Sequence, residues 1–402
     1  MKLAALLAAL AGIGSAAVVE VPVGDPSIRY LGRTSTESWS GDVRWDWSAA
    51  GAAITFSGTA CSIHLQAQGA LYDIYVDGKR TDTLDLSTNS DTLFPLASAL
   101  PAGVHTVAAR SRTEANYSVA RFRGFRIDGT PQAAAAAPDR RIEFYGNSIT
   151  CGYGILDTAK EHGFSVHTEE EALTYAALAS DSVGAERHVE CWSGRGVIQN
   201  YGGSTADPTL PMLYQRAGVY WDSTTAWDFS KWIPQVVAID LGTNDYSTSL
   251  PDSAKFHRVY KAWVDSLHVR YPAAKFVLLD GPMLSPGSEG FNRLRKNLDD
   301  IASDLVKEGI QASHLALSPQ DGTLGYGADW HPSRKQAAKN GQELAAFLRT
   351  FMGWGATSIE REDRLLSMDR PGLVVRSIGG HLVTGWMRDG RFEPLPATGR
   401  IR

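Results

Sequence analysis

Two short runs of almost unbroken apolar residues, VVAIDLG (Val236–Gly242) and KFVLLDGP (Lys275–Pro282), constrain most strongly how this chain can fold. Strands that are apolar on both faces predict a parallel sheet covered by helices on both sides. Strand-like segments also lie at residues 141–147, 188–193 and 314–318, and helical patterns at residues 171–183, 253–271, 290–308 and 332–351. Residues 140–352 are therefore predicted to form a flavodoxin-like, doubly wound α/β domain with a five-stranded parallel sheet, whose site lies at the carboxyl ends of the strands.

The residues before this domain have a different pattern. Residues 18–130 consist of short β-type segments separated by turn residues such as Asp77-Gly78, and they contain no long helical stripe. This pattern predicts an antiparallel β-sandwich. The proline-bracketed stretch PQAAAAAP (Pro131–Pro138) predicts a linker at residues 131–139. Residues 353–402 predict a small β extension, a hairpin or meander, for which we infer no function.

The first residues, MKLAALLAALAGIGSAA, combine a lysine, a short apolar stretch and small residues. Residues 1–17 are therefore predicted to be a cleavable signal peptide, and the protein to be secreted or periplasmic. The apolar stretch is too short for a membrane span, so no membrane partner is expected. The net charge of −5, with no run of basic residues, argues against a nucleic-acid partner. Nothing in the sequence indicates an oligomeric state.

The chain has three cysteines, Cys61, Cys151 and Cys191. In an oxidising compartment an odd number allows at most one intramolecular pair. Cys151 and Cys191 could pair, because each lies near the end of one of two strands that we expect to be neighbours. The Cα separation that a disulfide needs does not follow from the sequence, and buried free thiols are the interpretation that we favour.

Polar residues with catalytic potential follow the predicted strands. Ser148 comes directly after the first parallel strand and is the predicted nucleophile, although a serine at this place can also simply cap a helix. His331 precedes the last helix and is the predicted general base. Pro332 suits the first helical position and is expected to hold His331 in an extended conformation.

The second and third strands are followed by residues that could bind an oxyanion. Gly194 can bring a backbone N–H close to the substrate because it has no side chain, and Asn244 can supply an amide N–H. Taken singly, such a glycine indicates a tight turn and such an asparagine a turn cap. Serine, glycine, asparagine and histidine at four element ends together predict a serine hydrolase site.

The blocks YGNSITCGYG, WSGRGV, DLGTNDYS, DGPML and ADWHPS resemble those of the SGNH (GDSL-like) hydrolases. More narrowly, they resemble carbohydrate esterase family 2, the acetyl xylan esterase type with a jelly-roll sandwich ahead of the SGNH domain. The resemblance implies that Ser148 is the nucleophile, that His331 is the base, and that the N–H groups of Ser148 and Gly194 form the oxyanion hole with Asn244. It implies removal of acetyl groups from acetylated xylan, glucomannan or their oligosaccharides, without a metal or cofactor. The alternatives are a lipase, thioesterase or arylesterase of the same superfamily, or a carbohydrate-binding protein without activity.

The chain departs from the superfamily pattern just before His331. The orienting aspartate usually stands three residues before the histidine, where this chain has Ala328, and Asp329 is only two residues before it. In an extended segment the side chains of residues 329 and 331 point to the same side, so Asp329 could still reach the imidazole. We favour this triad. The alternative is a Ser–His dyad in which a backbone carbonyl orients the ring.

Residues beside the catalytic blocks are candidates for substrate contacts. Tyr246 follows Asn244, Met283 ends the fourth strand, and Trp330 precedes the predicted base, so all three are predicted to bind the substrate. The aromatic residues of the segment 202–232 are expected to pack mostly in the core.

Overall fold

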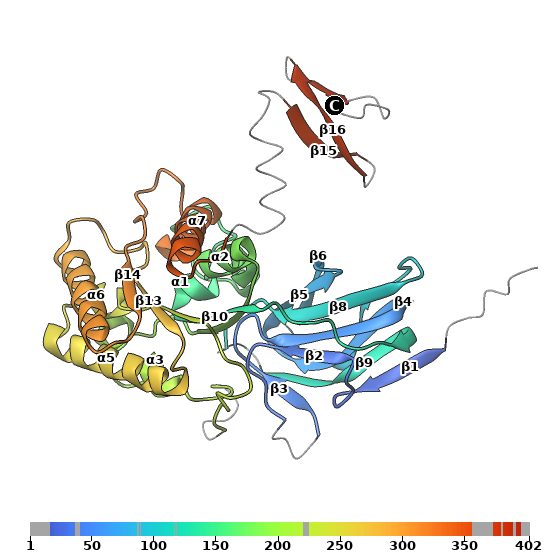
Figure 1. Cartoon of the computed structure of the whole chain (residues 1–402), viewed down its shortest axis with the longest axis horizontal. Coiled ribbons are helices and arrows are strands. Elements are labelled where there is room, and N and C mark those ends of the chain that lie inside the picture. Colours follow the sequence, from blue (N-terminus) through green and yellow to red (C-terminus); the bar gives the residue numbers. More distant parts are fainter. Residues whose placement is uncertain are drawn as a thin grey trace, which may run out of the picture.

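The computed structural model describes residues 17–36, 41–86, 88, 90–115, 117, 119–219, 225–355, 373–378, 381–388 and 391–394 (Figure 1). The predicted signal peptide, apart from its last residue, lies outside the described residues. Among the described helices, none has the length and apolar character that a membrane span requires.

The N-terminal half of the chain forms an antiparallel β-domain, as the sequence predicts. The longest strand, β4, pairs at different places with β2, β7, β8 and β9, so it connects the parts of the sheet. Asp77 and Gly78 join β5 to β6 with φ angles of 51° and 76°, the left-handed pair that a tight hairpin turn requires. The strands are β1 (Val18–Pro22), β2 (Ile28–Leu31), β3 (Val43–Trp45), β4 (Gly51–Ala67), β5 (Ala70–Val76), β6 (Lys79–Leu86), β7 (Ser90–Ala97), β8 (Val104–Ser111) and β9 (Ala120–Pro131).

Five parallel strands form the sheet of the second domain in the order β11-β10-β12-β13-β14, which confirms the predicted flavodoxin-like topology. The active-site edge is the one at which β10, β11 and β12 end. The strands are β10 (Arg140–Gly146), β11 (Ala185–Cys191), β12 (Val236–Asp240), β13 (Lys275–Leu279) and β14 (Ala312–Leu315).

Helices cover both faces of this sheet, in two pairs. Along β12, Val236 and Ala238 pack into the core beneath α2 and α7, whereas Val237 and Ile239 pack into the core beneath α5 and α6. This alternation is why the strand is apolar on both faces up to Asp240, its last residue. The long helices are α2 (Tyr175–Val183), α5 (Ser253–Arg270), α6 (Glu289–Lys307) and α7 (Arg334–Phe351), and the short ones are α1 (Ser148–Cys151), α3 (Leu210–Leu213) and α4 (Thr243–Tyr246).

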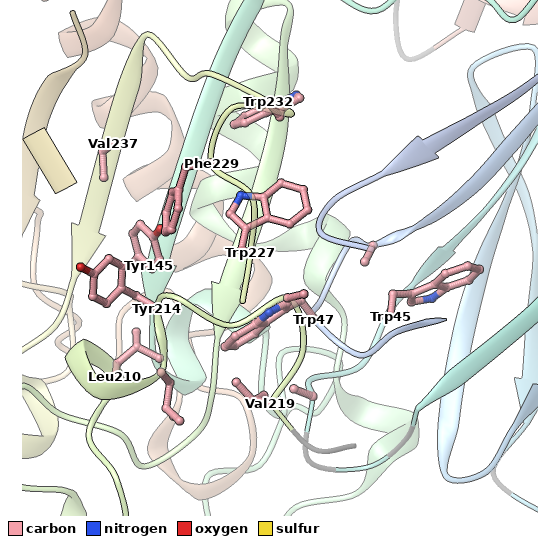
Figure 2. Close-up of a cluster of buried hydrophobic side chains, with 14 of the residues drawn as sticks. Trp45, Trp47, Tyr145, Leu210, Tyr214, Val219, Trp227, Phe229, Trp232 and Val237 are labelled. Atoms are coloured by element: carbon pink, nitrogen blue, oxygen red, sulfur yellow. The ribbon is translucent and has the colours of Figure 1, made fainter. Parts of the chain in front are cut away.

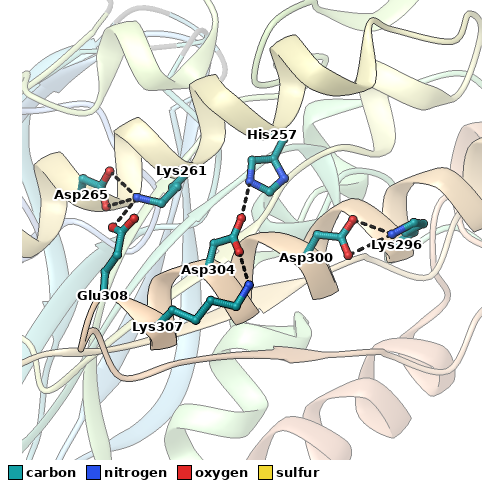
Figure 3. Close-up of polar contacts among 8 residues, drawn as sticks. All are labelled: His257, Lys261, Asp265, Lys296, Asp300, Asp304, Lys307 and Glu308. Atoms are coloured by element: carbon teal, nitrogen blue, oxygen red, sulfur yellow. Dashed lines mark hydrogen bonds and ion pairs between the residues drawn. The ribbon is translucent and has the colours of Figure 1, made fainter.

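Charged side chains fix the outer faces of α5 and α6 to each other. Lys261 of α5 contacts both Asp265 and Glu308, and His257 of α5 lies 3.2 Å from Asp304 (Figure 3). These groups are partly exposed, and such pairs each contribute less than about 1 kcal/mol. They mark the solvent side of two amphipathic helices.

The start of α7 differs from the prediction. Ser333 is the N-cap, its hydroxyl accepts the Gln336 N–H, and the helix begins at Arg334. Pro332 is therefore not in the first helical turn. His331 is extended as expected, with φ −72° and ψ 165°.

The described part of the C-terminal extension is an antiparallel meander of β15 (Leu373–Ile378), β16 (His381–Arg388) and β17 (Arg391–Pro394). Gly379-Gly380 and Asp389-Gly390, which stand between these strands in the sequence, lie outside the described residues.

An aromatic cluster joins the two domains. Trp47 from the β-domain lies beside Val219 and Trp227 of the segment 202–232, and Tyr145 of β10 lies next to Tyr214 in the same buried cluster (Figure 2). Tyr214, Trp227 and Trp232 of that segment are buried, as expected, and Tyr220 and Trp221 lie outside the described residues.

Arg33 is buried within the same interface. Its guanidinium lies 2.8 Å from Glu143 and 3.1 Å from Glu190, and all three side chains are fully buried. It also donates to the Tyr145 hydroxyl at 2.6 Å. The Arg33 guanidinium, from the β-domain, therefore supplies the positive charge beside Glu143 of β10, while burial raises the pKa of Glu190 of β11 well above its usual range.

Candidate active site

A tight turn at the end of β10 presents Ser148. The side chain of Asn147 caps α1 by accepting the Ile149 N–H at 3.0 Å, and Gly152 ends the helix with φ +87°. Gly146 is required because a Cβ there would lie 1.9 Å from Thr150 Oγ1. Ser148 is thus the first residue of a four-residue helix at the carboxyl edge of the sheet.

Cys151 and Cys191 form a disulfide, with their Cα atoms 5.6 Å apart. The expectation of free thiols is therefore wrong for these two residues. Gly146 lies opposite Cys191 in the parallel pairing of β10 with β11, which brings the turn after β10 beside the end of β11. The bridge joins the nucleophile turn to the strand that leads into Gly194, and Cys61 is buried and free.

His331 contacts Ser148 directly. Nε2 of His331 lies 2.8 Å from Oγ of Ser148. On the other side of the ring, Nδ1 lies 3.1 Å from the backbone carbonyls of both Ala328 and Asp329. Carbonyls only accept, so Nδ1 carries the hydrogen and Nε2 is left free to accept a proton.

Burial keeps the imidazole neutral. It lowers the pKa of His331 to about 4, against the opposing influence of the two carbonyls. The Tyr153 ring stacks on the imidazole at 4.1 Å between ring centres. The base is thus held by two backbone acceptors and one aromatic face.

The Asp329 carboxylate binds Tyr153 and has no hydrogen bond to the imidazole. It accepts the Tyr153 hydroxyl hydrogen at 2.6 Å. The expectation of an extended segment is wrong here, because Asp329 and Trp330 are left-handed, with φ of +48° and +62°. In this conformation the side chains of residues 329 and 331 do not point to the same side as they would in a strand, and the backbone carbonyls of Ala328 and Asp329 lie at Nδ1 instead.

Hydrogen-bond donors surround the space in front of Ser148. Gly194, with φ +76°, and Asn244 line the same cavity as Ser148 and His331. The Asn244 amide donates one hydrogen to the Arg195 carbonyl at 2.8 Å, which leaves its second N–H for a ligand. The Asp245 carboxylate accepts the N–H groups of residues 197, 198 and 199 at 2.9 to 3.1 Å. It thereby fixes the turn that follows Gly194 in the chain.

The cavity has a volume of about 580 Å³. Met283 and Trp330 line it, as predicted, and the Trp330 side chain is 52% exposed at the rim. Tyr246 is not in the wall: it is 4% exposed and its hydroxyl accepts from Asn297 at 3.0 Å. Because Tyr246 lies two residues beyond Asn244 in the helical turn α4, its side chain points toward α6 instead.

Other wall residues were missed by the sequence analysis. They are Tyr153, Ser193, Tyr201, Thr243, Ser247 and Leu284. Tyr153 and Tyr201 each stand beside glycines in the GYG and NYGG stretches, and an aromatic residue within a flexible turn was the available signal.

Among the described residues, two buried groups of side chains have atoms close enough together to bind a metal ion. In both groups some of these side chains already have other partners. The first contains Cys151, whose sulfur is in the disulfide. The second contains Glu143, His188 and Glu190, beside which Arg33 supplies the positive charge. Neither group includes a residue that lines the cavity in front of Ser148, among the residues that the structure describes.

Known proteins resemble both domains. Residues 30–138 match the family model "Carbohydrate esterase 2 N-terminal", and residues 144–339 match the "GDSL-like Lipase/Acylhydrolase family". A family two carbohydrate esterase from Clostridium thermocellum, solved in complex with cellohexaose, is 33% identical. The match has a TM-score of 0.77 and covers 82% of this chain and 100% of that one.

Curated relatives agree with this likeness. The cellulase/esterase CelE of Acetivibrio thermocellus is 34% identical over 333 residues, and the match covers 82% of this chain but only 40% of that protein. An acetylxylan esterase / glucomannan deacetylase of Cellvibrio japonicus is 25% identical, and the match covers 83% of this chain and 91% of that protein.

Proposed function

The chain belongs to carbohydrate esterase family 2, and on this premise we propose that it is an exported O-acetyl esterase that releases acetate from acetylated xylan or glucomannan. The observation that carries the proposal is the 2.8 Å contact between Ser148 Oγ and His331 Nε2 at the cavity wall. The Cys151–Cys191 disulfide supports export, since such bonds persist in oxidising compartments.

The reaction proceeds through an acyl-enzyme. Ser148 Oγ attacks the acetyl carbonyl while His331 Nε2 takes up the hydroxyl proton. The N–H groups of Ser148 and Gly194 and the amide of Asn244 stabilise the oxyanion. The proton then passes from His331 to the departing sugar oxygen. Water, activated by the same imidazole, hydrolyses the acetyl-serine and releases acetate.

Backbone carbonyls orient the base in this mechanism. The carbonyls of Ala328 and Asp329 hold the Nδ1–H, so Ser148 and His331 act as a dyad. Asp329 contributes through Tyr153, whose hydroxyl it accepts and whose ring stacks on His331. Of the two arrangements that the sequence left open, we propose the dyad.

The cavity wall suggests how an acetylated sugar binds. Met283 and Leu284 supply apolar surface for an acetyl methyl group. Trp330 and Tyr201, with side chains 52% and 62% exposed, offer aromatic faces for a sugar ring at the rim. An acyl chain longer than acetyl would have to displace the side chains of Met283 and Leu284.

The test is acetate release from acetylated xylan, acetylated glucomannan and simple acetyl and butyryl esters. We expect the acetylated polysaccharides to be hydrolysed faster than butyryl esters. We also expect Ser148→Ala to abolish the release, because no other hydroxyl contacts His331 Nε2 among the described residues. Faster hydrolysis of butyryl esters would contradict the carbohydrate substrate, and full activity of Ser148→Ala would contradict the mechanism.

A further inference from the structure

A glutamate of the β-domain reaches the loop beside the nucleophile. Glu114 lies between β8 and β9 and is 1% exposed. One carboxylate oxygen accepts the Ser193 backbone N–H at 2.6 Å, and the other accepts the Ser193 hydroxyl at 2.5 Å. Ser193 directly precedes Gly194 and lines the cavity.

The contact adds to the hydrogen bonds that hold this turn, in which the Arg195 N–H donates to the Trp192 carbonyl at 3.3 Å, and it acts on Ser193, the residue that directly precedes the Gly194 N–H. A Cβ on Gly194 would have no neighbour closer than the Tyr201 Cβ at 4.0 Å, so no packing sets the orientation of this glycine. Its carbonyl accepts the Tyr201 N–H at 2.8 Å. On its N-terminal side, the two-point anchor of Ser193 determines where the Gly194 N–H points.

Burying the Glu114 carboxylate costs free energy of folding, which argues that its charge has a functional role. Burial raises the pKa of Glu114, while the Ser193 hydrogen bonds and the Arg195 charge oppose the shift. A second carboxyl, Glu169, accepts the Glu114 N–H at 3.4 Å, and Arg112 donates to the backbone carbonyl of Glu169 at 2.7 Å. Burial and the charge of Glu114 raise the pKa of Glu169 well above its usual range, so Glu169 carries the proton of this pair.

We propose that Glu114 is a positioning residue for the esterase reaction: it holds Ser193 so that the Gly194 N–H points at the developing oxyanion. The inference rests on the proposed function. It makes the N-terminal domain part of the catalytic apparatus, although no atom of Glu114 touches the substrate. Glutamine in its place can accept through one oxygen only and lacks the charge, so it cannot hold both Ser193 donors equally well.

The test compares Glu114→Gln with the matched control Glu169→Gln. Loss of a whole oxyanion donor costs about 10²- to 10³-fold in kcat, and a misdirected donor should cost less, so we expect about a tenfold fall in kcat for Glu114→Gln. KM for acetylated xylan should change less than about twofold, because the oxyanion forms only in the transition state. Glu169→Gln mimics the protonated carboxyl that is already there, and we expect it to keep wild-type kcat.

Ser193→Ala tests the same contact from its partly exposed side, and it covers the case in which Glu114→Gln does not fold. We expect a loss of a few-fold in kcat, and a double variant with Glu114→Gln that loses less than the product of the two single losses. Wild-type kcat in the folded Glu114→Gln and Ser193→Ala proteins would overturn the inference. So would equal losses of kcat and thermal midpoint in Glu114→Gln and Glu169→Gln.

The proposed function is checked first, with the wild type and Ser148→Ala. Acetate release that Ser148→Ala abolishes, together with unchanged kcat in the Glu114 and Ser193 variants, would refute the positioning role alone. No acetate release by the wild type would refute the proposed function, and the positioning role with it.

Discussion

Asp329→Asn should keep at least about a tenth of the wild-type kcat, because the carboxylate binds Tyr153 and not the imidazole. Asparagine suits the test because it tolerates the left-handed conformation, with φ +48°, better than alanine does. Its amide oxygen can also accept the Tyr153 hydroxyl.

The magnitude follows from what the carboxylate contacts. An aspartate that orients the histidine of a triad accounts for about 10⁴ in kcat, or about 5.5 kcal/mol. Here the carboxylate accepts one hydrogen bond, which as a bond to a charged acceptor is worth about 1.5 to 3 kcal/mol; asparagine keeps a neutral bond worth about 0.5 to 1.5 kcal/mol, so about 1 to 1.5 kcal/mol is lost. Even if this whole free energy were transmitted to His331 through the Tyr153 ring, kcat would fall only about tenfold.

The assay measures kcat and KM for acetate release, with the thermal midpoint as a check on folding. Tyr153→Phe removes the other partner of the same hydrogen bond and should give a similar loss. The double variant should lose little more than either single variant. A loss above about 10³-fold in Asp329→Asn, with an unchanged thermal midpoint, would refute orientation by the two carbonyls.

Three further predictions concern pH, substrate and stability. The general base must be neutral, so kcat/KM should fall to half near the His331 pKa of about 4 and then about tenfold for each further pH unit of acidification; a midpoint near pH 6.5, the ordinary value, would contradict this. Trp330→Asn, which suits φ +62°, should raise KM for acetylated xylo-oligosaccharides several-fold while a small acetyl ester is unaffected, and equal effects on both substrates would argue against a sugar contact. Arg33→Met should lower the free energy of unfolding by about 3 to 5 kcal/mol, because it leaves buried carboxylates unpaired. In urea unfolding, the exposed pair Arg126–Glu20 provides the control: Arg126→Met should cost less than about 1 kcal/mol, and equal losses would refute the role of burial.

The sequence predicted the fold of the α/β domain because its apolar patterns are periodic. The run VVAIDLG has no polar face, and the structure places its residues alternately into the cores on the two sides of the sheet. The same logic brought Ser148, Gly194 and Asn244 to one edge, since the carboxyl ends of neighbouring parallel strands meet there.

What the sequence did not predict depends on single dihedral angles and on contacts between distant residues. The side chain of Asp329 was misplaced because two consecutive non-glycine residues adopt left-handed conformations, which a sequence pattern does not reveal. Tyr246 was misplaced because a helical turn points it away from the cavity. Arg33 and Glu114 were missed because nothing in the local sequence distinguishes a buried charge from an exposed one.

The contacts of Arg33 and Glu114 limit how this protein can be taken apart. The two family matches end and begin at residues 138 and 144, so a cut there would look natural for expressing the second domain alone. Such a truncated chain would keep every residue of the proposed dyad. It would also expose the Tyr214 and Trp227 rings to water and leave Glu143 without its cation. We expect that another sandwich grafted in front would not restore full stability and kcat unless it also carried an arginine and a glutamate at the matching places, so the two domains would have to be exchanged together.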